Sequence, residues 1–335
     1  MKKKKLSQSD LYISELTLGT LGFGSKVSEP DAHKQLDYAI ECGINVVDTA
    51  EIYPAPFSPE LFGISEKIIG SWLKKNKFKR QELVIATKCS GPGAFVKWVR
   101  NGKSMHNCSN ITLAVNGSLK RLKTDYIDLL QLHWPDRAVS PFSKLYKIPR
   151  EESTQNIEKT IEAILDLKKS GKVRFFGTCN ETPWGLMKLN HSYPDLVSVQ
   201  HPFNLLNRTF EKNHAEIVVN ENLGFFAYSP LAMGLLTNAT GNNIKDIDKH
   251  RKELRRKESK KIKMISEFKT LAQTQNISLS ALALRFMASL PFISSTIIGN
   301  STIQQLKENI ADYPQRLDGK TMKKINTIYL EGLQL

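Results

Sequence analysis

Three apolar runs with the character of buried strands each carry an ionisable side chain at or near their ends. These side chains are Asp48, Lys88 and His133, and Tyr53 follows Asp48 in a loop that contains several prolines. One such residue alone is more often a cap or a satisfied core group than a functional one. Burying an ionisable group without a partner is costly, so four of them at equivalent positions of three consecutive strands predict a shared site.

The charges of these four groups suggest a system that delivers a proton. A buried Lys88 ammonium needs a carboxylate, and Asp48 at the neighbouring strand end is the nearest candidate. A cation beside Tyr53 is expected to lower the phenol pKa from its reference value of about 10, and His133 would donate a second hydrogen bond to the same substrate oxygen. Such a site protonates an alkoxide, so it needs a hydride from a nicotinamide cofactor.

The segments that must position these residues alternate between strands and helices. Eight short runs rich in β-branched residues are bounded by Gly, Pro, Asn or Asp, and the segments between them have helical spacing. The strands are expected at residues 16–24, 44–50, 83–89, 127–134, 174–180, 196–203, 224–231 and 295–301. This order predicts an α/β fold, a closed parallel (β/α)8 TIM barrel, rather than a sandwich or a bundle.

The N-terminal region differs from the rest of the pattern. Polar and apolar residues alternate from Leu6 to Gly19, which predicts a β-hairpin that plugs the lower end of the barrel. Gly43 and Gly171 occur where a helix needs a left-handed residue to end. No linker rich in Pro, Gly or Ser interrupts the chain, so we expect a single domain over residues 1–335.

Composition narrows the class of protein. The net charge of +15 could indicate a polyanion partner, but its densest run, Lys249 to Lys263, also contains acidic residues and is better explained as a solvated helix face. We therefore expect no nucleic-acid partner. The four cysteines are scattered and form no CxxC pair, which argues against a disulfide framework and a metal site and favours a cytoplasmic location. No run approaches the roughly 20 apolar residues of a membrane span.

Motifs along nearly the whole chain resemble those of the aldo-keto reductase superfamily, in family order. They are "DTAEIY", "ATK", "DYIDLLQLHW", "GKVRFFGTCNE", "VQHPFNLLNR", "AYSPL" and "TIIGNSTIQQLKENI". The loops "DTAEIYPAPFSPE" and "CSGPG" are most similar to the Tas-like and potassium-channel β-subunit-like branch. The resemblance implies a (β/α)8 barrel that binds NADPH, or NADH, and reduces a small-molecule carbonyl substrate, and it maps the family's catalytic tetrad onto Asp48, Tyr53, Lys88 and His133.

The resemblance also implies a set of cofactor-binding residues. Asn180 and Gln200 match the residues that hydrogen-bond the nicotinamide carboxamide, and Tyr228 matches an aromatic position against which the nicotinamide ring packs. Further positions follow the pyrophosphate and the adenosine: Ser229, Leu231, Gly234, Gly299, Ser301, Gln305, Glu308 and Asn309. Backbone donors at the start of the last of these helices suit a phosphate.

Two departures from the family pattern affect the cofactor site. Cys179 stands where most members have a serine beside Asn180. A common lysine on the phosphate side is replaced within "NAT", residues 238–240, and Arg255 or Arg256 could compensate for it. A preference for NADPH over NADH needs a cation near the ribose 2′-phosphate, so both nucleotides stay open here.

The sequence defines the residues that would contact the substrate less clearly than those of the cofactor site. Trp134, Phe57 and Trp98 could form the walls of an apolar pocket, with ordinary packing as the alternative for each. The long segment from Ser90 to Asn110 is expected to set specificity. The polar segment from Asn238 to Lys263 could act as a lid over the cofactor, with a plain surface loop as the alternative. A second functional hypothesis is a nucleotide-sensing regulatory or partner-binding barrel with slow catalysis.

Overall fold

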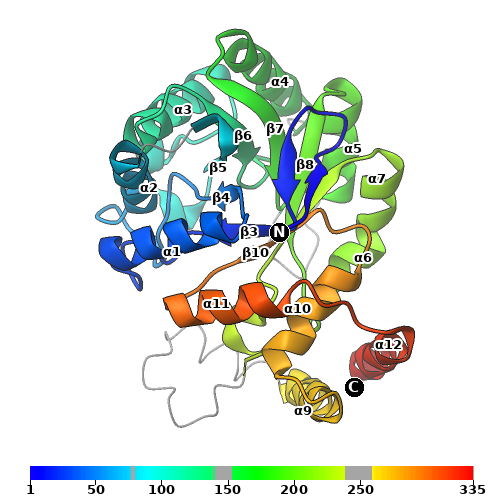
Figure 1. Cartoon of the computed structure of the whole chain (residues 1–335). Helices are drawn as coiled ribbons and strands as arrows, with labels where there is room; N and C mark the ends of the chain where they lie inside the picture. The colour runs from blue at the N-terminus through cyan, green and yellow to red at the C-terminus, as the bar shows by residue number, and fades with distance from the viewer. Residues whose placement is uncertain (77–79, 138, 140–152, 238–258, 335) are drawn as a thin grey trace.

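Eight parallel strands form a closed barrel in this computed structural model, which describes residues 1–76, 80–137, 139, 153–237 and 259–334 (Figure 1). The barrel order is β10-β3-β4-β5-β6-β7-β8-β9, and the fold class predicted from the sequence is confirmed. The strands are β3 (Leu16–Gly19), β4 (Val46–Asp48), β5 (Val84–Cys89), β6 (Ile127–Leu132), β7 (Val173–Cys179), β8 (Leu196–Pro202), β9 (Gly224–Tyr228) and β10 (Ser295–Ile298).

Helices surround the barrel and cover its outer face (Figure 1). Several begin at a side chain that accepts a backbone N–H, such as Ser28, Thr182 and Ser278, and Gly43 has the positive φ of 84° predicted for a helix end. The helices are α1 (Glu29–Glu41), α2 (Ile64–Lys75), α3 (Cys108–Leu122), α4 (Ser153–Lys169), α5 (Pro183–Ser192), α6 (Thr209–Asn213), α7 (Ala215–Asn220), α9 (Ser259–Thr274), α10 (Leu279–Ser289), α11 (Ile303–Asp312) and α12 (Gly319–Gln334).

The predicted N-terminal hairpin is present and closes one end of the barrel. Strands β1 (Lys3–Lys5) and β2 (Tyr12–Ser14) pair antiparallel, and the buried side chains of Leu6, Leu11 and Ile13 join an apolar cluster with the residues at the starts of the barrel strands. Leu6 lies so close to Gly224, at the start of β9, that a Cβ there would meet it at 2.1 Å. The strands finish at the opposite end, the mouth of the barrel, which the hairpin leaves uncovered.

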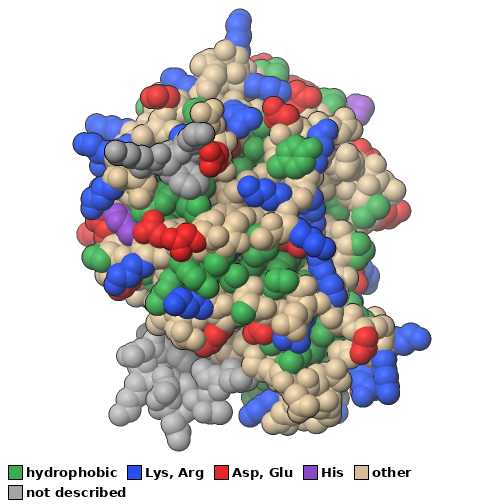
Figure 2. All heavy atoms as spheres, viewed as in Figure 1, with side chains coloured by type: hydrophobic (Ala, Val, Ile, Leu, Met, Phe, Trp, Pro, Cys, Tyr) green, Lys and Arg blue, Asp and Glu red, His purple; other side chains and the backbone are tan. Residues whose placement is uncertain are grey.

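The surface does not concentrate charge on the face viewed in Figure 2. Lys and Arg side chains are distributed over that face, with acidic and apolar side chains among them. In the part of the chain that the structure describes, no helix is both long enough and apolar enough to cross a membrane. All four cysteines are free thiols.

A buried carboxylate links three strands near the closed end of the barrel. Asp128, in β6, is fully buried and forms ion pairs of 2.6 Å with Arg80 and 2.9 Å with Arg174, which belongs to β7. It also accepts the backbone N–H of Ile85, in β5, at 2.9 Å. Burial removes the water that would otherwise solvate the Asp128 carboxylate, and these donors take its place. The charged carboxylate is therefore stable in the interior only while the donors are present.

Asp128→Ala should therefore destabilise the barrel strongly, by about 3–5 kcal/mol, because it leaves two guanidinium groups and a backbone N–H without their partner. The measurement is the free energy of unfolding from urea denaturation. Asp195→Ala is the matched control: Asp195 forms an exposed ion pair with Lys168, whose loss should cost at most about 1 kcal/mol. Equal losses in the two variants would contradict this account.

Candidate active site

The barrel brings the four predicted catalytic residues together at its open mouth. Asp48 is the last residue of β4, Lys88 lies near the end of β5, and His133 directly follows β6. The strand register places Asp48 beside Ala86 and Lys88 beside Gln131. Tyr53 lies in the loop after β4, and this loop brings its hydroxyl to within 3.5 Å of Lys88 Nζ.

Lys88 is at the centre of this group. Its Nζ lies 2.5 Å from Asp48 Oδ2, donates to the Thr49 carbonyl oxygen at 2.9 Å, and reaches the Tyr53 hydroxyl at 3.5 Å. The ammonium also lies 5.0 Å from the centroid of the Tyr53 ring. The rings of Tyr53 and His133 meet edge to face with centroids 5.8 Å apart. A carboxylate, an ammonium, a phenol and an imidazole thus share one small volume.

Burial dominates the electrostatics of Tyr53. It raises the phenol pKa to about 12, because the contribution of Lys88, which lowers the pKa, is outweighed by desolvation together with the nearby charge of Asp48. The expectation that the cation would bring this pKa down towards neutrality is therefore wrong for the site as it stands. Burial also acts to lower the pKa of Lys88, but Asp48 more than compensates and the net pKa is raised. Near pH 7 the phenol keeps its proton, beside a permanent cation.

His133 is a neutral imidazole in this environment. Burial, the charge of Lys88 and the nearby His106 hold its pKa well below the usual value. Its Nδ1 is buried and has no hydrogen-bond partner among the described residues, while its backbone carbonyl accepts from Asn180. A neutral ring has one N–H to donate, which suits a hydrogen bond to a carbonyl oxygen.

Buried amides connect the catalytic residues with those predicted to hold the nicotinamide. Asp48 Oδ1 accepts from Gln131 Nε2 at 3.2 Å and from Gln200 Nε2 at 2.9 Å. The Tyr228 hydroxyl donates to Asn180 Oδ1 at 2.8 Å, and Asn180 Nδ2 donates to the His133 carbonyl oxygen at 2.9 Å. Asn180, Gln200 and Tyr228 are therefore joined to the catalytic group through hydrogen bonds.

The remaining predicted cofactor residues lie after β9 and β10, which are neighbours in the barrel. The turn from Ser229 through Leu231 to Gly234 has left-handed φ values, 56° at Ser229 and 92° at Gly234. Gly299 is exposed, and no atom lies within 4 Å of the place where its Cβ would be. Ser301 is also exposed, at the N-terminus of α11. The exposed backbone at Gly299 leaves room for an anionic group near the start of this helix.

Three further predicted residues serve the local structure of this loop. Gln305 Oε1 accepts the Ser301 N–H at 2.8 Å, and Asn309 Nδ2 donates to Asn300 Oδ1 at 2.7 Å. Glu308 is exposed and accepts from Gln304. In this structure Gln305 and Asn309 thus shape the helix start. Arg255, Arg256, residues 238–240 and most of the segment predicted as a lid lie outside the described residues.

A row of aromatic rings leads from Tyr53 to the outside of the mouth. Phe57 stacks on Tyr53 with centroids 6.3 Å apart, Phe95 lies 6.4 Å from Phe57 and 5.1 Å from Trp134, and Trp134 packs against His133 at 4.8 Å. Phe95 was not among the predicted pocket residues, although it lies within the loop predicted to set specificity. Trp98 is instead partly buried against the apolar cluster of Ala50, Ile52, Val96, Val99 and Trp134.

That loop is attached to the catalytic strand end by a buried ion pair that sequence reasoning missed. Glu51, three residues after Asp48, accepts two hydrogen bonds from Arg100, at 2.8 and 2.9 Å, and the Ser90 N–H at 2.6 Å. Arg100 also donates to the Ser90 carbonyl oxygen at 3.0 Å. Glu51, close to the predicted catalytic residue Asp48, therefore holds both ends of the segment that carries Phe95.

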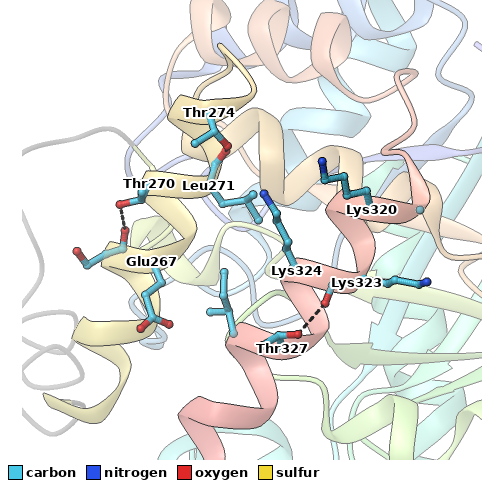
Figure 3. Close-up of a pocket in the computed structure, with 11 residues that line it drawn as sticks. Glu267, Thr270, Leu271, Thr274, Lys320, Lys323, Lys324 and Thr327 are labelled. Atoms are coloured by element: carbon cyan, nitrogen blue, oxygen red, sulfur yellow. Dashed lines mark hydrogen bonds between the residues drawn. The ribbon is translucent and has the colours of Figure 1, made fainter.

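A second concavity, of about 790 Å³, lies outside the barrel between α9 and α12. Figure 3 shows the two helices on either side of this groove, with Lys320, Lys323 and Lys324 on α12 and Glu267 and Thr270 on α9. These ionisable side chains are exposed or half-exposed, and none of the four predicted catalytic residues lines this groove. Because the buried and strongly perturbed groups converge at the barrel mouth, we place the candidate active site there.

Comparison with known proteins agrees with this geometry. The chain is 36% identical to the Tas protein of Escherichia coli (strain K12) over 340 residues, which cover 98% of each chain. It is 30% identical to an uncharacterized oxidoreductase of Bacillus subtilis (strain 168), over 97% of this chain and 94% of that one, and 35% identical to an aldo-keto reductase of Babesia bovis, over 68% and 88%. Residues 15–330 match the aldo/keto reductase family, and the chain belongs to that family of oxidoreductases.

Proposed function

We propose that the protein reduces aldehydes or ketones to alcohols with NADPH, and with NADH as a second nucleotide. One observation carries the proposal: the Lys88 ammonium bridges Asp48 and Tyr53 while the neutral His133 ring faces the same phenol. When bound, the dihydronicotinamide supplies a hydride from C4 to the carbonyl carbon. The chain itself then has to orient the carbonyl, donate a proton and exclude water.

Tyr53 acts as the proton donor in this proposal. Its raised pKa keeps the phenol protonated until negative charge develops on the substrate oxygen. Lys88 stabilises the phenolate that remains, and Asp48 keeps the ammonium charged within the buried site. His133 donates a hydrogen bond to the same oxygen, which orients the carbonyl and stabilises the growing charge.

The residues present fit a dinucleotide. Asn180 and Gln200 supply amide groups for a carboxamide, Tyr228 supplies a ring, and the turn that contains Ser229, Leu231 and Gly234 would lie beside the pyrophosphate. The exposed Gly299 and Ser301, with Asn300 Nδ2 buried and without a partner among the described residues, suit the adenosine end of the molecule. Gln305, Glu308 and Asn309 belong to the same end in this proposal.

Tyr53→Phe tests the proposal directly. We expect it to bind NADPH with unchanged affinity and to lose turnover of a good aldehyde by about 10²–10⁴-fold, because only the proton donor is removed. Steady-state kinetics and a fluorescence titration with NADPH measure the two quantities. Tyr12→Phe, at an exposed tyrosine of the hairpin, is the matched control. Turnover that survives in Tyr53→Phe would refute the assignment.

Phe95→Ala tests whether the aromatic row contacts the substrate. Because stacking contributes about 0.5–1.5 kcal/mol, KM for aromatic aldehydes should rise roughly threefold to tenfold, with little change in kcat. KM for a small aliphatic aldehyde, measured on the same variant, should hardly change. A parallel increase for both substrates would show that Phe95 only supports the loop.

His133→Gln tests whether the imidazole is neutral. A histidine with a lowered folded pKa takes up a proton only when the chain unfolds, so it makes the native protein less stable as pH falls below about 6.5. The variant lacks this penalty. The stability of the variant relative to the wild type should therefore improve by about 1.2 kcal/mol when the pH falls from 6 to 5, measured by urea denaturation. His191→Gln is the control for the loss of an exposed imidazole, and a pH-independent difference for His133→Gln would exclude a neutral ring.

A further inference from the structure

Gln131 is a buried polar residue of β6 whose side chain the catalytic assignment leaves unused. It is fully buried, lies two residues before His133, and pairs in register with Lys88 across the two strands. Its Nε2 donates to Asp48 Oδ1 at 3.2 Å, and its Oε1 accepts from Gln200 Nε2 at 3.1 Å. Gln131 therefore contacts both the catalytic carboxylate and an amide expected at the cofactor.

This arrangement uses both N–H donors of the Gln200 side chain. A side-chain amide has two N–H donors on nitrogen and an oxygen that only accepts. Asp48 Oδ1 takes one N–H of Gln200 at 2.9 Å and Gln131 Oε1 takes the other at 3.1 Å. Because both donors are satisfied inside the barrel, the oxygen is the only polar atom of Gln200 that can meet a ligand.

The charge of Asp48 sets this polarity. An ionised carboxylate can only accept, so it attracts the nitrogen of both glutamines, and Gln131 must then turn its oxygen towards Gln200. Reversing the Gln200 amide would place its oxygen against the Asp48 carboxylate and against Gln131 Oε1. Both contacts would be repulsive in a buried site, where unpaired polar atoms are costly.

The Gln200 oxygen has a weak hydrogen-bond partner, the Cys179 thiol. Cys179 Sγ lies 3.6 Å from Gln200 Oε1 and 3.2 Å from Asn180 Nδ2. The Cys179 sulfur thus contacts both the amide oxygen of Gln200 and the amide nitrogen of Asn180. An acceptor and a donor in this arrangement complement a primary carboxamide, which presents an NH₂ group and a carbonyl oxygen side by side. A thiol is a weak donor and acceptor, so it competes poorly for either atom.

We propose that Gln131 is a positioning residue that, together with Asp48, fixes the Gln200 amide with its oxygen towards the cofactor, so that the site selects a carboxamide by its NH₂ group. This inference rests on the proposed use of a nicotinamide cofactor. It extends that proposal by linking the catalytic carboxylate to the recognition of the cofactor through a chain of oriented amides. Gln131 itself contacts neither the substrate nor the cofactor.

The test compares binding of NADP⁺ with binding of its 3-acetylpyridine analogue, in which a methyl group replaces the NH₂. Both dissociation constants are measured by equilibrium titration of protein fluorescence, without turnover. We expect the wild type to prefer NADP⁺ roughly threefold to tenfold, as the loss of one hydrogen bond to an oriented acceptor predicts. In Gln131→Met the Gln200 amide keeps its hydrogen bond to Asp48 but loses the acceptor of its second N–H, so its orientation is held less firmly and the preference should fall to less than about twofold.

Two further variants make the result decisive. Gln131→Asn keeps an amide but is too short to bridge Asp48 and Gln200, so it should also lose the preference even if Gln131→Met folds poorly. Gln35→Met is the matched control, because Gln35 is a fully buried glutamine of α1 without a hydrogen-bond partner among the described residues. It should keep the wild-type ratio. A purely structural role of Gln131 would weaken both ligands equally and leave the ratio unchanged.

The outcomes separate this inference from the proposed function. If the wild type binds NADP⁺ and all three variants keep the same preference over the analogue, Gln131 does not orient Gln200 and the inference fails alone. If the wild type binds NADP⁺ and its analogue with equal affinity, the inference also fails while the proposed reaction stands. If the wild type binds neither dinucleotide, the proposed function fails and this inference fails with it.

Discussion

The structure of the mouth depends on one buried ammonium. Lys88 is 1% exposed, so its charge has lost nearly all contact with water and must be balanced by the protein. Asp48 supplies the opposite charge and the Thr49 carbonyl oxygen accepts a second hydrogen bond. Removing either charge would leave the other one buried and alone, which is far more costly than losing both. The pair therefore sets the protonation and the orientation of the groups around it.

The consequences of the pair extend in two directions. Towards the proposed proton donor, it places a cation beside the Tyr53 phenol, which burial keeps protonated. Towards the residues predicted to hold the cofactor, the second oxygen of Asp48 accepts hydrogen bonds from the amides of Gln131 and Gln200 and thereby sets their polarity. The Asp48 carboxylate thus contacts the Lys88 ammonium with one oxygen and the two glutamine amides with the other.

The sequence predicted the barrel and the convergence of the four ionisable residues because both follow from local patterns. Strand runs, helix spacing and the strand-end positions of Asp48, Lys88 and His133 are visible without any long-range contact. The predicted direction of the Tyr53 pKa shift was wrong. Desolvation raises this pKa, and its size depends on how many side chains surround the phenol, which the sequence does not reveal. The contacts of Gln131, Phe95 and Glu51 were also missed, since each is defined by a partner on another strand or loop. Glu51 illustrates the limit: it lies inside the recognised "DTAEIY" motif, yet only the fold reveals Arg100 as its partner.

Stability and chemistry are supported at opposite ends of the same strands. At the closed end, Asp128 is paired with Arg80 and Arg174, and the hairpin covers the apolar interior, so those polar contacts are permanent. At the open end, several buried polar atoms have no hydrogen-bond partner among the described residues, including His133 Nδ1, Ser90 Oγ and Trp98 Nε1. Unsatisfied groups are costly in a fold that has no use for them. Those at the mouth fit a site whose polar groups are completed by ligands.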